Sequence, residues 1–484
     1  MERRISRRRA LHGAGGLALA AALGGRAAAA PDLTGRLARY MADAATRPLP
    51  DRVTRAAKQR ILDTLAAMVS GAALPPGKLA IDYVRAQGGT AEACVATTDI
   101  VTTAVNAAFA NGMLAHADET DDFHAFTKAH PGCSTVPAAL AMAERTHASG
   151  AALVRAVVLG YDLCCRLLTA LGPDALRADD RSVEGMSATF GAAAAAAAIA
   201  RFDETRMRYA ISYAAQQVSG VFTWERDDEH VEKAFDFGGM GARNGVAAAT
   251  LVEAGFTGVA DALEGERNVL AALRVAGAEP APEALVADLS ERFYIEETAI
   301  KTYPVGYPIQ APLDAFLSLV REQRLKPDDV RRIVARLPAD GARIVDGRAM
   351  PDVNCQHILA VALVDGAITL ENSHARERMT DPRVLAVRER VELVADPALV
   401  DAAAPRSGRV EVTLADGRKV ERFVRHAPGT PENPLDDAGV NGKARGLIEP
   451  VLGVAKTDAL IRRVNALDEL GDVRELRALL MLAR

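Results

Sequence analysis

The stretch NGMLAHADETDDFHAFTKAHP, residues 111–131, combines a loop rich in ionisable groups with apolar sequence on both sides. Four acids lie within five of its positions and three histidines flank them; these residues are Asp118, Glu119, Asp121, Asp122, His116, His124 and His130. No other window of the chain is as dense in groups that can move protons near neutral pH. The pattern is compatible with a catalytic loop and also with a solvated loop whose acids cap helix ends.

Both neighbours of this loop are predicted helices. The apolar, Ala-rich residues before it predict a helix over Ile100–Leu114, with Asp99 placed to cap its start. After it, Val136–Glu144 has a helical pattern with Pro137 near its beginning. A polar loop fixed between two buried helices is a common place for chemistry, because the helices hold it rigidly.

Helical periodicity continues through most of the chain before residue 290. The predicted helices are Asp32–Arg47, Pro50–Ser70, Lys78–Ala86, Gly150–Leu171, Phe190–Ala200, Glu204–Val218 and Gly245–Gly255. Later β-branched runs predict strands at Val330–Leu337, Glu389–Ala395, Val410–Leu414 and Lys419–Val424, with a turn at Ala415-Asp416-Gly417. A helix is predicted at His357–Asp365, and Val440–Leu482 returns to helix.

The chain is therefore predicted to be mainly α, a large all-helical domain with an inserted smaller α+β lid domain. Residues 30–290 form the first part of the helical domain, 291–427 the lid and 428–484 the helical return. The composition, 49% hydrophobic and 25% charged over 484 residues, is typical of a globular protein. The net charge of −5 argues against a nucleic-acid partner.

Residues 1–29 have the pattern of an export signal. Ser6-Arg7-Arg8-Arg9-Ala10-Leu11 precedes an apolar, Gly-rich segment, and Ala27-Ala28-Ala29 offers a cleavage site. The paired arginines resemble a twin-arginine signal, which predicts a periplasmic or secreted protein, or a cytoplasmic one if the leader is not used. The apolar segment is too short for a spanning helix, so no stable membrane anchor is expected.

Cysteine and histidine usage bears on disulfides and metals. The five cysteines, Cys94, Cys133, Cys164, Cys165 and Cys355, are an odd and scattered set, so free, mostly buried thiols are expected. The chain contains neither a CxxC pair nor HExxH, so no dedicated metal site and no cofactor are predicted.

Three further segments are candidates for binding. Lys233 and Asp236 precede a Gly-rich turn predicted to open a helix at about Arg243, and a helix N-terminus can bind an anion. Lys301 and Tyr303 lie on a Pro-bracketed loop where a lysine can bind a carboxylate. His357 begins a predicted helix. Each has a structural alternative: loop packing, a surface lysine and a satisfied core histidine.

These segments together resemble the MmgE/PrpD family, which includes cofactor-independent 2-methylcitrate dehydratases, cis-aconitate decarboxylase and an iminodisuccinate epimerase. The matching motifs, which occur in the same order as in the family, are NGMLAHADETDDFH, HPGCSTVPAALAMAE, FGAAAAAAAIARFD, KAFDFGGMGARNGVAAATLVEAGFTG, IKTYPVGYPIQAPLDA and NPLDD. The resemblance spans nearly the whole chain after the leader. It implies a helical domain formed by both chain ends, an inserted α+β lid, a homodimer and an active site between the domains.

The resemblance also implies site residues. Position by position it matches Glu119, Asp121, Asp122, His130, Lys233 and Lys301, and His357 falls where many members have a tyrosine. With the candidates read from the residues themselves, we expect catalytic roles for His130, Lys301, Lys233, Asp122 and Asp121, and substrate contacts for Glu119, His124, Tyr303 and His357. The chain departs from the family pattern at several points. A histidine often found before the FGAAA helix is replaced by a region offering only Ser182 and Glu184, a lid histidine is Gly306, and the glycine turn is one residue longer.

The chemistry expected is that of a dehydratase-type lyase on a small di- or tricarboxylate. Lys233 and Lys301 would bind carboxylates and stabilise the enolate that forms when a proton beside a carboxylate is removed. His130 is the predicted general base or acid, with Asp121 or Asp122 orienting it. The alternatives are an epimerase or decarboxylase of the same family, and, because histidines are missing, an exported carboxylate-binding protein without catalysis.

Overall fold

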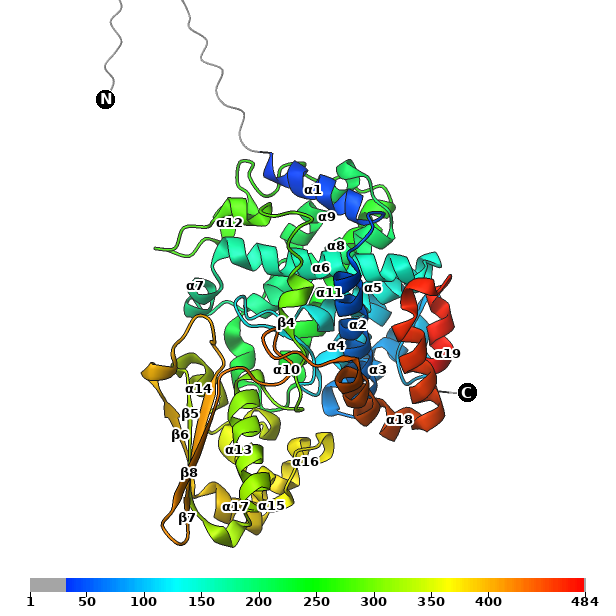
Figure 1. Ribbon diagram of the computed structural model, residues 1–484. Coiled ribbons are helices and arrows are strands. Elements are labelled where there is room, and N and C mark those ends of the chain that lie inside the picture. Colours follow the sequence, from blue (N-terminus) through cyan, green and yellow to red (C-terminus); the bar gives the residue numbers. More distant parts are fainter. Residues whose placement is uncertain (1–31, 483–484) are drawn as a thin grey trace, which may run out of the picture. The chain divides into compact units, whose positions relative to one another are not determined.

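Small side chains determine how the helices of the first part pack. The computed structural model describes residues 32–482, and in it α8 (Val183–Ile199) packs against both α6 (Gly150–Leu171) and α11 (Met240–Glu253) (Figure 1). A Cβ added at Gly245 of α11 would come within 2.4 Å of the Ala193 backbone nitrogen. The alanine run Ala192–Ala198 therefore serves close backbone approach, as its composition predicts.

The other helices of this part surround that centre. They are α1 (Leu33–Ala44), α2 (Asp51–Gly71), α3 (Pro75–Gln87), α4 (Ala104–His116), α5 (Pro131–Thr146), α7 (Pro173–Ala178), α9 (Glu204–Gln217), α10 (Val231–Ala234) and α12 (Val269–Leu273). Two-residue strands β1 (Ala93–Cys94) and β2 (Val101–Thr102) pair with each other, as do β3 (Phe123–His124) and β4 (Thr298–Ala299).

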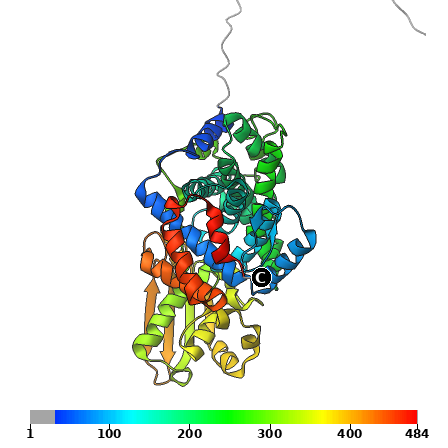
Figure 2. The same cartoon turned by 90° about the vertical axis from the view of Figure 1, so that its right-hand side faces the viewer.

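The C-terminal segment returns to these helices. α18 (Asp437–Asn465), which is interrupted at Gly453, packs against α2, and α19 (Arg477–Leu480) follows it (Figure 2). The side-chain cap of α18 is Asp436, which accepts from the Gly439 N–H at 2.8 Å. The two ends of the described chain thus share one hydrophobic core.

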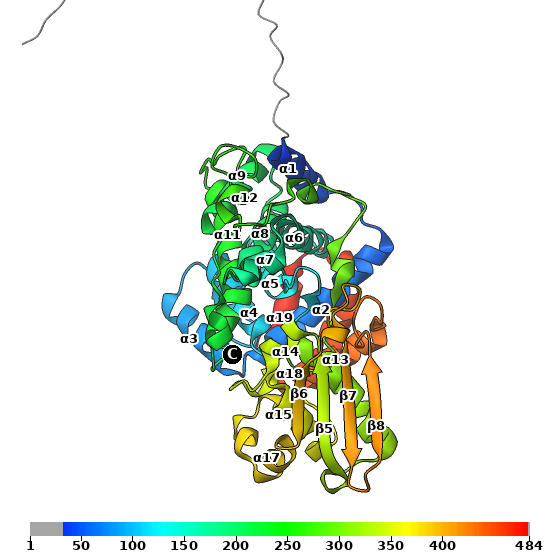
Figure 3. The same cartoon turned by 90° about the vertical axis from the view of Figure 1, so that its left-hand side faces the viewer.

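A four-stranded sheet forms the remainder, in the order β6 (Val391–Ala395), β5 (Val330–Leu337), β7 (Gly408–Leu414), β8 (Lys419–Val424) (Figure 3). β5 and β6 are parallel and the other pairs antiparallel. Buried and half-buried positions alternate along β7, so the sheet has one core face. The helices of this part are α13 (Gln310–Gln323), α14 (Ala339–Val345), α15 (Cys355–Asp365), α16 (Leu370–His374) and α17 (Pro382–Arg388).

The two parts have separate hydrophobic cores. One core draws on residues 33–300 and 440–480, which we call the helical part, and the other on residues 305–414 of the sheet part. The expectation of a mainly α chain is confirmed. The predicted domain boundaries and the role of the sheet part as an inserted lid stay predictions. The predicted export signal lies outside the described residues.

Two local predictions were wrong. α4 begins at Ala104 with Thr103 as its cap, because Val101–Thr102 is a strand, and Asp99 instead pairs with Arg85. No helix begins at about Arg243: α10, the π-helical segment η2 (Phe235–Gly239) and α11 are continuous, so the predicted anion-binding helix N-terminus does not exist there. The glycines instead allow close packing, since a Cβ at Gly238 would lie 2.1 Å from the Gly112 carbonyl oxygen.

All five cysteines are free and buried, as predicted. Within residues 32–482, no single helix is both long and apolar enough to cross a membrane; only α2 and α3 taken together, bent by 85°, meet the length and composition.

Candidate active site

A short strand pair brings the acidic loop and Lys301 together. The loop leaves α4 at His116 and enters α5 at Pro131. Between them β3 pairs with β4, Phe123 opposite Ala299, and Lys301 follows β4 by two residues. This pairing is the local reason why residues 180 positions apart in sequence meet.

Asp121 is the acceptor at the centre of the site. Its Oδ2 lies 2.9 Å from Nδ1 of both His116 and His130, and its Oδ1 lies 3.1 Å from the Lys301 ammonium. Burial alone would raise the pKa of Asp121, but the charges of His116, Lys301 and His130 hold it well below its usual value. An ionised carboxylate only accepts, so both histidines donate Nδ1–H and the second nitrogen of His130, Nε2, can reach a ligand.

Glu119 joins the two lysines. Its Oε2 accepts from Lys301 at 3.0 Å and its Oε1 accepts from Lys233 of α10. Glu119 and both lysines are buried, and Glu119 has a left-handed backbone (φ 55°) that a non-glycine residue rarely adopts. The site therefore contains two ammonium groups that converge on one carboxylate.

Burial shapes the protonation of the site. It lowers the pKa of Lys233 well below its usual value, and the nearby charge of Lys301 acts in the same direction. It also holds the pKa of His116 well below its usual value, although Asp121 opposes the shift. Aromatic rings exclude water around these groups: the Lys233 ammonium lies 5.2 Å from the centre of the Phe237 ring and 5.6 Å from that of Trp224.

A small inner cavity of about 40 Å³ opens onto these groups. It is lined by Glu119, Phe123, His130, Arg177, Glu184, Trp224, Lys233, Phe237, Gly306, Tyr307, Pro308, Ile344, Val353 and Arg406, and so by residues of both the helical and the sheet part. Lys301 is only 1% exposed and is not among the lining residues, because Glu119 covers it.

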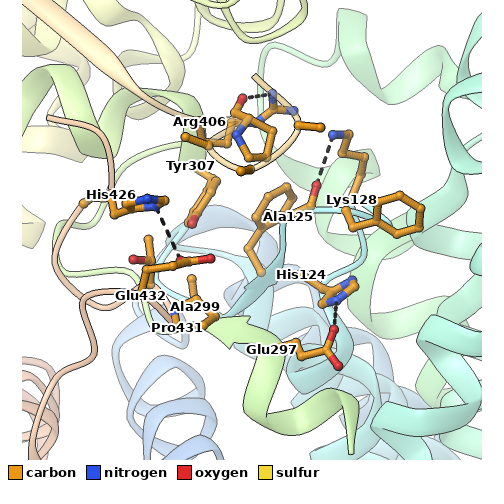
Figure 4. A pocket seen from close by; sticks show the side chains of 18 of the residues that line it. His124, Ala125, Lys128, Glu297, Ala299, Tyr307, Arg406, His426, Pro431 and Glu432 are labelled. Atoms are coloured by element: carbon orange, nitrogen blue, oxygen red, sulfur yellow. Dashed lines mark hydrogen bonds and ion pairs between the residues drawn. The ribbon is translucent and has the colours of Figure 1, made fainter. Parts of the chain in front are cut away.

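A larger outer cavity of about 380 Å³ shares the walls Phe123, Tyr307 and Arg406 with the inner one (Figure 4). Lys128 at its edge donates to the Ala125 carbonyl at 3.0 Å, and burial lowers the pKa of this lysine to about 8. Arg425 and His426 also line this cavity. The acids Asp174, Glu297 and Glu432 line it as well, so its polar groups are of mixed character.

Two clusters have donor sets that can hold a metal: His116, Asp121 and His130, and His116, Glu119 and His230. In both, the carboxylate already contacts lysine: Asp121 contacts Lys301, and Glu119 contacts both Lys233 and Lys301. Ammonium groups at this distance repel a divalent cation and attract an anion. The electrostatics of the site favour an anionic ligand.

Four predicted site residues lie away from the inner cavity. Asp122 accepts from the Gly132 N–H at 2.9 Å at the start of α5. His124 bonds Thr127 and faces Glu297 in the outer cavity (Figure 4). The Tyr303 hydroxyl donates to Asp314. His357 is buried in the sheet part, where neither ring nitrogen has a hydrogen-bond partner among the described residues.

Three residues join the site without having been assigned to it from sequence. His116 bonds Asp121, and His230 lies between Glu119 and Asp352, with its Nε2 3.6 Å from Glu119 and its Nδ1 3.5 Å from Asp352. His230 precedes Lys233 by three positions. This spacing often brings two side chains together, so the sequence offered a reason to assign His230 to the site. Nothing in the sequence indicated that Asp352 belongs to the site, because only the tertiary fold brings the sheet part next to α10.

Comparison with known proteins shows the family of the chain. Residues 35–280 match the model of the MmgE/PrpD N-terminal domain, and residues 303–469 match that of the MmgE/PrpD C-terminal domain. The chain belongs to the MmgE/PrpD family. The resemblance inferred from sequence motifs is therefore confirmed.

Curated MmgE/PrpD relatives match over nearly their full length. Cis-aconitate decarboxylase of Homo sapiens is 28% identical over 465 residues, which cover 89% of this chain and 91% of that protein. Cis-aconitate decarboxylase of Aspergillus terreus is 24% identical over 478 residues, covering 93% and 96%. A cis-aconitate decarboxylase-like protein, oryM, of Aspergillus oryzae is 24% identical over 485 residues, covering 93% and 97%.

Proposed function

We propose that this protein is a cofactor-independent lyase that acts on a small di- or tricarboxylate. The observation that carries the proposal is the convergence of two buried ammonium groups, Lys233 and Lys301, beside a histidine that lines the cavity and is held by Asp121. The family membership and the relatives named as cis-aconitate decarboxylases support a carboxylate as ligand.

In a dehydration, His130 removes a proton from the carbon beside a carboxylate and hydroxide leaves from the next carbon, taking up a proton to become water. The charge that develops on the enolate is stabilised by the two ammonium groups in a site from which aromatic rings exclude water. Asp121 holds His130 with Nδ1 protonated, so that Nε2 serves as the base.

The second candidate is decarboxylation, which the names of the relatives favour. Carbon dioxide then leaves with the C–C bond broken, and the electron pair that stays behind is delocalised toward a remaining carboxylate. His130 would act as the acid and donate a proton to that carbon. The same lysines and the same histidine serve both reactions, so the geometry supports the lyase class more strongly than either reaction.

The test is a reaction survey of the full chain with hydroxy- and unsaturated di- and tricarboxylates in D₂O, followed by NMR. Loss of water with alkene formation supports the dehydratase, and release of carbon dioxide with deuterium on the carbon that carried the lost carboxyl group supports the decarboxylase. Deuterium exchange without loss of a group supports an epimerase instead. Carboxylate binding, detected as a raised melting temperature, with no reaction of any acid would contradict the lyase proposal and favour a binding protein.

A further inference from the structure

Glu119 occupies the position that a ligand carboxylate would need. It bonds both lysines and separates Lys301 from the inner cavity. The inner cavity of about 40 Å³ has room for roughly three water molecules, far less than a tricarboxylate requires. A carboxylate can therefore reach both ammonium groups only if the Glu119 side chain moves.

His230 offers the displaced carboxylate a second position. Its Nε2 lies 3.6 Å from Oε1 of Glu119, and its Nδ1 lies 3.5 Å from Oδ2 of Asp352. Nε2 of His374 lies 3.7 Å from the same Asp352 oxygen. These separations exceed hydrogen-bond length, and the three atoms His230 Nε2, Asp352 Oδ2 and His374 Nε2 are buried without a hydrogen-bond partner among the residues described.

The backbone at both positions is also unusual. Glu119 (φ 55°) and His230 (φ 63°) are both in the left-handed region, which costs about 1–3 kcal/mol at a non-glycine residue. Glu119 therefore faces a residue whose backbone is equally strained and whose Nε2 has no hydrogen-bond partner among the described residues. A shift of the Glu119 carboxylate of about 1 Å toward His230 would complete a hydrogen bond there.

We propose that Glu119 is an internal occupant of the carboxylate site, and that it moves to His230 when a substrate carboxylate binds. Asp352, on the other side of the His230 ring, holds His230 in place to receive it. His230 is a positioning residue in this account: it acts through Glu119 and does not touch the reacting carbon. The inference rests on the proposed function, because it requires a carboxylate ligand at Lys233 and Lys301.

The test is calorimetric titration of the full chain with propane-1,2,3-tricarboxylate, a saturated acid without a leaving hydroxyl group. Glu119→Gln removes the charge that holds the internal occupant on the lysines, so we expect it to bind this acid at least tenfold more tightly than the wild type. His230→Gln removes the position that receives Glu119, so we expect it to bind at least tenfold more weakly.

Controls separate the possible failures. His147→Gln, at an exposed histidine (58% of the side chain), should leave the affinity unchanged. Asp352→Asn should weaken binding, and it serves if His230→Gln does not fold. Binding by Glu119→Gln no tighter than by the wild type, or affinity unchanged in both His230→Gln and Asp352→Asn, would overturn this inference and leave the lyase proposal intact. No binding of any carboxylate by the wild type would overturn both.

Discussion

Each buried acid of the loop is compensated by its own donors. Asp118 accepts from the Thr120 N–H and hydroxyl, Asp121 from two histidines and a lysine, and Asp122 from a helix N–H. Asp118 and Asp122 thus hold the loop in place, whereas Glu119 and Asp121 contact the lysines. The sequence alone could not show which acids hold the loop and which contact the lysines, since all four residues are acids within five positions.

His130→Ala tests the proton-transfer role. We expect turnover to fall at least about 100-fold, the usual contribution of a general acid or base, while the circular dichroism spectrum and melting temperature stay near those of the wild type. Steady-state kinetics with the substrate found in the NMR survey provides the measurement. Tyr303→Phe is the matched control, because its hydroxyl bonds Asp314 outside the inner cavity. Turnover within a few-fold of wild type would remove His130 from the mechanism.

Lys301→Met tests the ion-pair network. The change leaves Glu119 and Asp121 buried with less compensation, so we expect the free energy of unfolding to fall by about 3–5 kcal/mol in urea denaturation. Adding Glu119→Gln removes one of the two carboxylates that have lost Lys301 as a partner, and should recover at least about 1 kcal/mol. A double variant less stable than Lys301→Met alone would contradict the pairing described here.

At the scale of the element, the continuous helix from α10 to α11 explains a departure from the family pattern. The glycine-rich motif is one residue longer than is usual in the family. The π-helical segment η2 accommodates the longer motif, because its five residues form a wider turn than an α-helix does. The glycine pair correctly predicted an irregularity here but not its kind, because Gly238 and Gly239 suggest a turn when they are considered without the rest of the fold. Their use is tertiary, since Gly238 packs against Gly112 of α4.

Gly238→Ala tests that packing. An added Cβ would meet the backbone carbonyl of Gly112, which cannot rotate away, so we expect a loss of at least about 2 kcal/mol in the free energy of unfolding. Gly446→Ala is the matched control in α18, where the added Cβ meets nothing within 4 Å. There alanine should raise the free energy of unfolding by about 0.5–1 kcal/mol, because the unfolded chain has less backbone freedom with alanine than with glycine. Similar effects of the two changes would contradict the close approach of α4 and η2.

His357 in the first turn of α15 makes the stability of the sheet part sensitive to acid. Burial lowers its pKa to about 4, and nearby Arg388 and Arg378 act in the same direction. Between pH 4 and about 6.5 the unfolded chain binds a proton that the folded protein excludes, so this contribution to stability is complete above pH 6.5 and is lost as pH falls to 4. When the pH falls from 6.5 to 4, the free energy of unfolding of His357→Phe should decrease by about 3 kcal/mol less than that of the wild type. Urea denaturation at several pH values measures the difference, and parallel profiles would contradict it.

Elements bounded by turn residues were predicted closely. α6, β5 and β8 have the predicted bounds: α6 is a long apolar run that begins after Ser149 and ends before Gly172-Pro173, and β5 and β8 are strand-like runs with turn residues beside them. The positions of side chains on loops were harder to predict from sequence. Lys301, Lys233 and His130 meet as the motifs predicted, whereas Tyr303 and His357 bond or pack elsewhere, since side-chain direction on a loop depends on contacts that sequence spacing does not encode.

At the scale of the molecule, the inner cavity lies between residues of two hydrophobic cores. Contacts such as His230–Asp352 and Arg343–Glu225 join the helical part to the sheet part. The predicted lid movement would open the cavity by separating these pairs. The predicted homodimer and twin-arginine export remain predictions, which light scattering and fractionation of the expressing cell would test.

The central claim is that Lys233 and Lys301 bind a substrate carboxylate beside His130. A crystal structure of the protein with propane-1,2,3-tricarboxylate tests it most directly. We expect one ligand carboxylate to contact both ammonium groups, with a ligand carbon about 3–3.5 Å from Nε2 of His130. A ligand bound only in the outer cavity, with Glu119 still on both lysines, would contradict the claim.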